Sequence, residues 1–338
     1  MNSSDDVTLR PPTPVRRLLH ALPDEIGVVA ALVVLVLAVG VVQPNFLSAN
    51  NLIQLVSNSA YFGVIALGMV FLLALGEIDL SVGWNFNFSA VLTAELMLFG
   101  VDPWIAAACG IGFGAALGLL NGVMTVALGL PSIIVTLGTL SVFQGLSLVV
   151  TKSRAIIPPD LSSSFFAVTN SRLFGIPFVV YGFVFAAIVL HLVFHKSRFG
   201  YRVQAIGSNA EAAKLAGIPI NRTRVVALVL MGALCGLAGA TFVGVRQAID
   251  PTTGGEFLLV AIAAAVIGGT PVTGGMGTIV GALIGALIIS TIRSGVIFLG
   301  VDARWSTFVT GAVILLAVAI DKALRVQRDR SRNRNREN

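Results

Sequence analysis

Two carboxylates and a hydroxyl interrupt an apolar run that is long enough to be most of a membrane helix. Residues 66–76 are apolar and end in glycine, and Glu77, Asp79 and Ser81 follow within five residues. In hydrocarbon, irregular backbone is tolerated only where protein buries it or water fills a cavity. This first break therefore predicts an element of a translocation path at membrane depth. It is equally compatible with a helix end at the interface, where Ser81 caps the next helix and Asp79 complements its positive end.

A second stretch, residues 205–219, carries the signals of a short isolated helix. Ser208 and Glu211 have the spacing of a capping box, in which each side chain bonds the backbone N–H of the other residue. Gly217 and Pro219 end the pattern, which predicts a helix over 209–216. A helix of eight residues is marginal in water. Its small side chains therefore rest on the membrane domain or insert into a groove on another protein.

The composition places both stretches in a membrane protein. Hydrophobic residues make up 56% of the 338 and charged residues only 11%, whereas a soluble domain carries about 25% charge. The mean hydropathy is +0.92. Cys109 and Cys235 lie in apolar runs and have no metal-ligand or disulfide spacing. The net charge of +6 comes from basic clusters that alternate with apolar runs, which favours topology signals over a nucleic-acid site.

We predict an all-α, polytopic integral membrane protein with about ten transmembrane helices and broken helices near the centre. Each apolar run approaches the ~20 residues that cross about 30 Å of hydrocarbon. The transmembrane domain is expected over 26–322, between a disordered tail, 1–25, and a basic disordered tail, 323–338. The expected spans are residues 26–42, 52–75, 84–99, 104–127, 132–150, 177–194, 225–245, 257–268, 278–299 and 306–320.

Basic residues orient the spans, because lysine and arginine in short loops stay cytoplasmic. The segment 195–224 and the C-terminal tail are rich in both. With ten spans, the two termini and the 195–224 loop lie in the cytoplasm, and the polar segment 151–176 lies outside. That outer segment carries Lys152, Arg154 and Arg172, which is a mild departure from the rule.

Glycine patterns indicate a second break and close helix contacts. Residues 268–275 form another glycine-rich interruption, and corresponding breaks in two halves of a transporter indicate a central site. Glycines also recur every four residues, which leaves one helix face almost without side chains. We expect such a face to pack within the chain or against a second subunit. The glycines concerned are Gly110, Gly114, Gly118, Gly122, Gly277, Gly281 and Gly285.

Arg293 is one of the few ionisable residues inside the expected spans. At the centre of a membrane helix an arginine costs about 2.5–3.5 kcal/mol on insertion scales. Its place near the outer end of the span lets the side chain reach the interface. The alternative is that it faces water or a charged partner.

Three motifs, in order along nearly the whole chain, resemble those of the ribose-type sugar ABC importer permeases. They read Gly-Glu-Ile-Asp-Leu-Ser-Val-Gly at 76–83, Ala-Ile-Gly-Ser-Asn-Ala-Glu-Ala-Ala-Lys-Leu-Ala-Gly-Ile at 205–218, and Ala-Val-Ile-Gly-Gly-Thr-Pro-Val-Thr-Gly-Gly-Met-Gly-Thr at 265–278. In that family the first motif usually has a second glycine where this chain has Glu77. The difference leaves open whether the turn or the substrate differs here.

The resemblance implies the membrane subunit of a binding-protein-dependent importer in a bacterial-type plasma (inner) membrane. An external solute-binding protein would deliver a monosaccharide or related polyol, and a second permease copy, identical or not, would complete the path in the lipid. A cytoplasmic ATPase would hold ATP and Mg²⁺, so this chain would bind no cofactor and no metal. None of its four lysines follows a glycine, so it has no phosphate-binding loop.

The resemblance assigns a role to the short helix, and the side chains near the first break suggest a second set of functional residues. The ATPase would grip the short helix, through Ser208, Glu211, Ala212, Ala213, Lys214, Leu215 and Gly217. Near the first break, polar groups offer hydrogen bonds to a sugar, and aromatic rings offer a surface to its apolar face. The expected pathway residues are Glu77, Asp79, Ser81, Asn85, Phe86, Asn87 and Phe88, although packing is the expected fate of at least one phenylalanine.

Two other function classes stay open on the residues alone. A secondary transporter coupled to protons or Na⁺ would use Glu77 and Asp79, because intramembrane carboxylates are candidates for ion relays. A structural or signalling membrane subunit would show no ligand-dependent ATP turnover in its complex. Uptake that an ion gradient drives without ATP would favour the secondary transporter.

Overall fold

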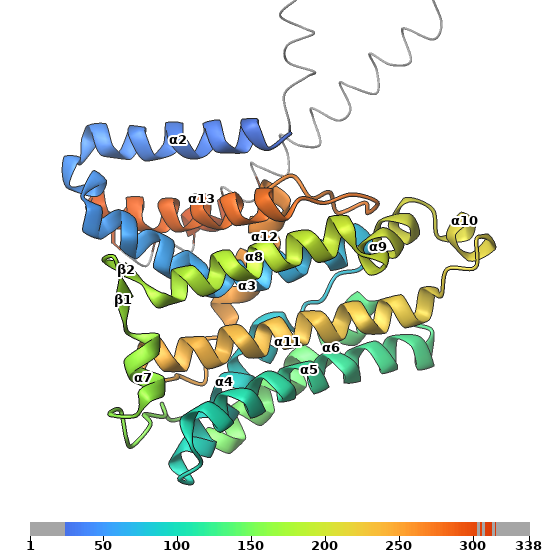
Figure 1. The fold of residues 1–338 in the computed structure, drawn as a ribbon, viewed down its shortest axis with the longest axis horizontal. Coiled ribbons are helices and arrows are strands. Elements are labelled where there is room, and N and C mark those ends of the chain that lie inside the picture. Colours follow the sequence, from blue (N-terminus) through green and yellow to red (C-terminus); the bar gives the residue numbers. More distant parts are fainter. Residues whose placement is uncertain (1–23, 303–304, 306–307, 313–314, 316–338) are drawn as a thin grey trace, which may run out of the picture.

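The computed structural model describes residues 24–302, 305, 308–312 and 315, and this part is a bundle of helices (Figure 1). Within it, seven helices are long and apolar enough to cross a membrane, as expected of a polytopic membrane protein. These helices are α2 (Asp24–Val42), α3 (Ala49–Leu75), α5 (Pro103–Leu128), α6 (Ser132–Thr151), α8 (Phe178–Lys196), α11 (Ile220–Arg246) and α13 (Ile279–Phe298).

Shorter elements complete the bundle. They are η1 (Pro44–Leu47), α4 (Val82–Leu98), α7 (Ser164–Thr169), the antiparallel pair β1 (Arg172–Leu173) and β2 (Ile176–Pro177), α9 (Arg198–Ser208), α10 (Ala210–Leu215) and α12 (Gly255–Ile267). In Figure 1, α9 and α10 lie at one end of the long helices, and α7 and the β-hairpin lie at the other. We call these the α10 end and the α7 end.

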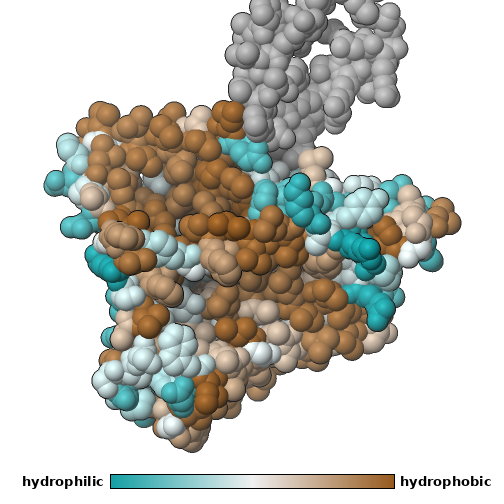
Figure 2. Space-filling model, in the orientation of Figure 1, coloured by the Kyte–Doolittle hydropathy of each residue, from teal (hydrophilic) through white to brown (hydrophobic). Residues whose placement is uncertain are grey.

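Hydrophobic side chains cover the middle of the face drawn in Figure 2, and hydrophilic ones gather toward the two ends. Among the described residues many large apolar side chains are exposed, such as Val34 on α2, Val149 on α6 and Phe185 on α8. A contiguous exposed apolar surface of this kind would be a liability in water. It is the surface that a lipid bilayer covers.

Helix α3 forms the centre of the bundle. From residue 60 to residue 75 its sequence is apolar on every side, which is typical of a helix that is buried all round. Every residue from Ser59 to Leu75 is buried. Near its end, Phe71 packs edge-on against Phe194 of α8 and parallel to Phe199 of α9. The end of α3 is thereby held by both of these helices.

The expectation of ten spans is not confirmed. The expected spans 84–99 and 257–268 correspond to α4, with 17 residues, and α12, with 13 residues. Both are shorter than the ~20 residues that a full crossing takes. The last expected span, 306–320, lies largely outside the described residues, as does the tail 323–338. Of the expected tail 1–25, only its last two residues are described, and they already belong to α2.

The two short helices meet at their N-terminal ends inside the bundle. Gly83, in the first turn of α4, and Gly254, just before α12, are both buried. A Cβ atom on either glycine would overlap the carbonyl oxygen of the other. The backbones are therefore in direct contact, which is an arrangement that only glycine permits.

The helix faces that carry these glycines pack within the chain, which is one of the two arrangements expected. On α5, a Cβ at Gly114 would overlap Gly232 of α11, and a Cβ at Gly118 would overlap Leu228 of the same helix. A Cβ at Gly110 would overlap the Thr93 side chain of α4, and a Cβ at Gly122 would lie 3.0 Å from Cα of Val225 on α11. At the start of α13, Gly281 and Gly285 lie against the backbone of α12 and its C-terminal end, and Gly277 lies against side chains of α3 and α8. Small residues let these backbones approach and gain dispersion contacts.

Candidate functional site

Helix α3 ends where the sequence predicts, at Gly76. This glycine has a φ of +80°, a left-handed conformation that costs glycine little. The N–H of Gly76 bonds the carbonyl of Leu73, and the N–H of Glu77 bonds that of Leu72, both at 2.9 Å. These bonds satisfy the last carbonyls of the helix, as in a glycine C-cap.

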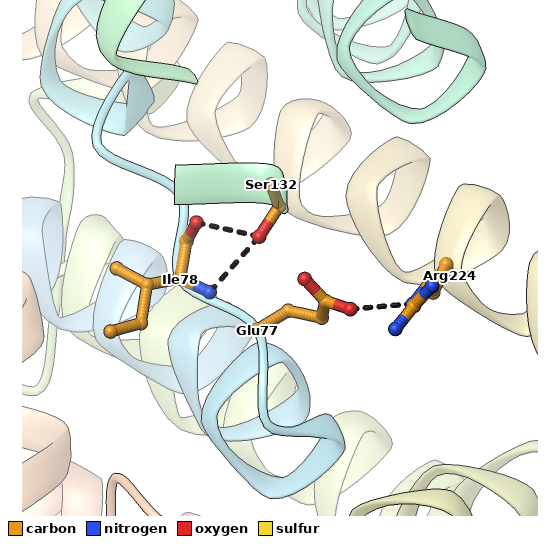
Figure 3. Close-up of polar contacts among 4 residues, drawn as sticks. All are labelled: Glu77, Ile78, Ser132 and Arg224. Carbon is orange, nitrogen blue, oxygen red and sulfur yellow. Dashed lines mark hydrogen bonds and ion pairs between the residues drawn. The ribbon is translucent and has the colours of Figure 1, made fainter. Parts of the chain in front are cut away.

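The irregular segment that follows is supported by hydroxyl groups of α6 (Figure 3). Ser132 accepts a hydrogen bond from the Ile78 N–H at 3.3 Å and donates one to the Ile78 carbonyl at 2.9 Å. Four residues on, Thr136 accepts from the Leu80 N–H at 3.0 Å. The first two turns of α6 thus replace the partners that a helix would supply, which is the condition for irregular backbone at membrane depth.

Asp79 and Ser81 form a buried polar cluster with Asn121 of α5. One carboxylate oxygen of Asp79 accepts from the Ser81 N–H at 2.7 Å and from the Ser81 hydroxyl at 2.6 Å. The Asn121 amide donates to the Ser81 hydroxyl at 2.8 Å. Ser81 does precede α4, but its side chain makes no capping hydrogen bond to that helix. The expected cap is therefore wrong: the Ser81 hydroxyl donates to Asp79 and accepts from Asn121, rather than from an N–H of α4.

Glu77 forms an ion pair with Arg224, which lies near the start of α11. The carboxylate oxygen lies 2.5 Å from Nε of the arginine (Figure 3). The glutamate side chain is 9% exposed and that of the arginine 36%. The pair links the first break to the helix that follows α10. It gives Glu77 a structural partner at the position where the resembling family usually has glycine.

The other expected pathway residues are packed into the chain. The Asn85 amide donates to the Gly114 carbonyl at 3.2 Å. The Asn87 amide donates to the Asp250 carbonyl at 2.9 Å and accepts from Ser147 at 2.7 Å. The ring of Phe86 is fully buried and stacks on that of Phe257 at 4.4 Å between centroids. Phe88, which is partly buried, packs edge-on against Phe113 of α5. In this conformation their contacts lie within the chain, and contact with a solute stays a prediction.

The expected capping box at Ser208 and Glu211 is wrong. Ser208 is the last residue of α9, and the N-cap of α10 is Asn209, whose side chain accepts from the Ala212 N–H at 2.9 Å. Helix α9 was not among the predicted elements, although its signals are present in the sequence. Ser197 caps it at the Gly200 N–H, and apolar residues recur at Phe199, Val203 and Ile206.

Helix α10 stands out from the bundle. It covers six residues rather than eight, and Gly217, with a φ of +75°, follows its end. Ala213 is buried at 4% exposure, and Leu215 is 91% exposed. Glu211, Ala212 and Lys214 are also exposed. One small side chain thus anchors the helix on the bundle, and the others are free to contact another surface.

Both breaks and the end of α9 meet at one point. The Gly275 N–H, in the second break, donates to the Ala74 carbonyl at the end of α3, at 2.8 Å. The Ser208 hydroxyl lies 3.5 Å from the Gly275 carbonyl. A Cβ at Gly207 would overlap both the Ala74 carbonyl and the Gly275 nitrogen. We call these residues, 74–76, 207–208 and 274–275, the junction. It joins the three motifs, which lie far apart in the sequence.

Comparison with known proteins gives a consistent assignment. A family model described as "Branched-chain amino acid transport system / permease component" matches residues 51–318. The ribose import permease RbsC of Bacillus subtilis is 39% identical over 88% of this chain and 92% of its own. The chain belongs to the ABC transporter permease family. The D-allose permease AlsC of Escherichia coli is 35% identical over 89% of this chain and 92% of its own.

Another ABC permease in this range is the L-arabinose permease AraH of Azospirillum brasilense. It is 33% identical over 89% of this chain and 88% of its own. No solved structure is significantly similar to this chain. The match to the family model thus extends from α3 to α13 and includes both breaks, the junction and α10.

Proposed function

We propose that this ABC permease is the membrane-spanning subunit of an ATP-driven, binding-protein-dependent importer for a monosaccharide or related polyol. The names of its relatives support a sugar, since those relatives are ribose, allose and arabinose permeases. The observation that carries the mechanism is the exposure of α10 together with the junction. Helix α10 offers an exposed surface that an ATPase could bind. Through the junction, backbone contacts connect this helix to both breaks in the membrane domain.

In this proposal the α10 end faces the cytoplasm of a bacterial-type cell, together with both termini. Its basic residues favour that side. They are Lys196, Arg198, Arg202, Lys214, Arg222 and Arg224. A cytoplasmic ATPase, which carries ATP and Mg²⁺, binds α10. A solute-binding protein docks at the α7 end, and a second permease copy, identical or different, completes the path through the lipid. The chain itself binds no cofactor.

The contacts suggest how force would travel. A displacement of α10 moves Asn209 and the end of α9 with it, because the two helices are contiguous. Gly207 and Ser208 contact Ala74 and Gly275. The same displacement therefore reaches the end of α3 and the second break. The Glu77–Arg224 pair forms a second connection. It joins the start of α11, which follows α10 in the chain, to the first break.

The experiment is co-purification of the permease with its ATPase after substitution on α10. We expect Leu215→Arg to reduce the recovered ATPase at least tenfold, because a charge replaces a large apolar side chain in a packed contact. Glu211→Arg should act in the same direction. Leu173→Arg, at an exposed leucine of the opposite end, is the matched control and should leave recovery unchanged. Equal ATPase recovery in all three variants would contradict the docking role of α10.

No observation favours the ion-coupled alternative. Asp79 accepts two hydrogen bonds from Ser81, and Glu77 is paired with Arg224, so both carboxylates have structural partners. The relatives are named as ABC permeases or as sugar import permeases, which also gives no support to a purely structural or signalling subunit.

A further inference from the structure

Three basic side chains lie where α8 passes into α9, at the α10 end. Lys196 is the last residue of α8, and Arg198 and Arg202 lie one turn apart in the first two turns of α9. All three side chains are exposed. Residues 191–210, which include them, contain no aspartate or glutamate. We call Lys196, Arg198 and Arg202 the basic corner.

The basic corner has no ion pair with a carboxylate of the described residues. In that part of the chain the ion pairs join Arg224 to Glu77, and Arg293 to Glu256 of α12 at 3.7 Å. Of the two expectations for Arg293, a charged partner is thus the one observed. The charges of the basic corner are left for an anion from outside this part of the chain.

The exposed side of α8 places the basic corner at the edge of the lipid. Side chains that recur three or four residues apart lie along one side of a helix. On α8 such a series of exposed side chains consists of Phe185, Ile188, Leu192 and Lys196. It is apolar as far as Leu192, and the lysine follows one turn later. In Figure 2 the hydrophobic band also gives way to hydrophilic side chains toward the α10 end. The side of α8 that faces lipid tails therefore ends in a positive charge.

Helix α9 continues this arrangement. Val203 and Ile206 are buried, so one side of the helix faces the bundle. The side chains of Arg198, Tyr201 and Arg202 are exposed. Tyrosine is enriched at the headgroup level of membranes, because its ring is apolar and its hydroxyl is polar. The exposed side of α9 thus has the residue types of a membrane surface.

The position of Arg198 does not stabilise α9 itself. It is the first residue of the helix, and a basic side chain there is repelled by the positive end of the helix dipole. The same positive end attracts an anion that lies beside it. Guanidinium groups also bind phosphate through paired hydrogen bonds. An arrangement that is unfavourable for α9 alone therefore becomes favourable when a phosphate group is bound.

We propose that Lys196, Arg198 and Arg202, together with Tyr201, bind the phosphate headgroup of an anionic phospholipid in the leaflet at the α10 end. The acyl chains of this lipid lie along the apolar side of α8. The lipid holds the start of α9 at the membrane surface, and the last residue of α9, Ser208, lies in the junction. The inference goes beyond the proposed importer function and does not depend on it.

The test is the binding of a fluorescent phosphatidylglycerol to the full-length permease in detergent. The variant is Arg198→Gln with Arg202→Gln. The matched control is Lys214→Gln with Arg222→Gln, which removes two exposed charges from α10 and the start of α11 at the same end. We expect the variant to bind the probe at least about tenfold more weakly, because each basic residue near a membrane surface contributes to the attraction of anionic lipid. The control should bind it unchanged.

Unlabelled phosphatidylglycerol should displace the probe, whereas phosphatidylcholine and inorganic phosphate should not. Displacement by inorganic phosphate would indicate a site for a free anion and would overturn the inference. An unchanged affinity in the Arg198→Gln, Arg202→Gln variant would overturn it as well, and so would an equal loss in the control, which would reduce the effect to net charge.

A second variant separates lost charge from a damaged helix. Arg198→Lys with Arg202→Lys keeps both charges and should retain most of the binding. A tenfold loss in this variant too would indicate damage to α9 and would contradict the inference. Recovery of the ATPase with the glutamine variant tests the other possible occupant. Loss of the ATPase with unchanged lipid affinity would assign the basic corner to a protein contact.

Discussion

The ion pair between Glu77 and Arg224 is unequal in its surroundings. The carboxylate is almost fully buried, while about a third of the arginine side chain is exposed. A partly exposed arginine that loses its carboxylate partner can be hydrated, but a buried carboxylate that loses its arginine cannot. Removal of the arginine and removal of the glutamate should therefore reduce the free energy of unfolding by different amounts.

We expect Arg224→Ala to destabilise the permease by about 2–4 kcal/mol, because it leaves a buried charge without a partner. Glu77→Ala should cost only about 1 kcal/mol, close to the value for a partly exposed pair. Thermal unfolding of the purified variants in one detergent measures both. The double variant should resemble Glu77→Ala alone. Equal losses in the two single variants would contradict the asymmetry.

Residue patterns predicted the end of α3 but not its partners. Gly76 could be placed because glycine readily adopts the left-handed conformation that ends a helix. The partners of Ser81 could not be predicted, because a serine hydroxyl can serve the helix N-terminus or nearby side chains, and Asn121 reaches it only through the packing of α5. The partner of Glu77 lies on a distant helix, and no local pattern indicates it.

At the scale of elements, the segment between α8 and α11 differs most from expectation. The basic residues of 195–224 indicated a cytoplasmic loop, but α9 occupies its first part with an apolar side of Phe199, Val203 and Ile206. Helix α9 was not predicted, because basic and polar residues lie between its apolar residues. Helices are present near the expected spans 84–99 and 257–268, as α4 and α12, but they are too short to confirm two crossings, and their contact at Gly83 and Gly254 depends on tertiary packing.

The position of Gly207 makes α9 sensitive to a single side chain. A Cβ at this residue overlaps the Ala74 carbonyl, so Gly207→Val must push the end of α9 away from the junction. We expect the variant to retain its ATPase, because α10 is unchanged, and to lose at least tenfold in ATP-driven uptake. Both quantities are measured on the reconstituted importer.

Gly182→Val on α8 is the matched control, since nothing lies within 4 Å of its Cβ position. It should keep uptake and ATPase recovery alike. Normal uptake by Gly207→Val would show that the junction does not transmit force. Loss of ATPase recovery in that variant would place the effect on docking rather than on coupling.

At the scale of the whole molecule, the two ends should label from opposite sides of the membrane. Leu215 on α10 and Phe174 at the turn of the hairpin are each 91% exposed. Cysteine at either position should react with a membrane-impermeant maleimide, and the background variant should first have Cys109 and Cys235 replaced by serine and alanine, respectively. In intact cells we expect Phe174→Cys to react and Leu215→Cys to react only after the membrane is opened. The reverse pattern would invert the proposed topology.

The contact between α4 and α12 has a consequence for how the two helices can move. Since no side chain separates the backbones of Gly83 and Gly254, neither short helix can tilt without displacing the other. We infer that a rotation of α12 is passed on directly to α4, so that the two short helices change orientation together. Alanine at either glycine would force the two backbones apart, and this link between the helices would be lost.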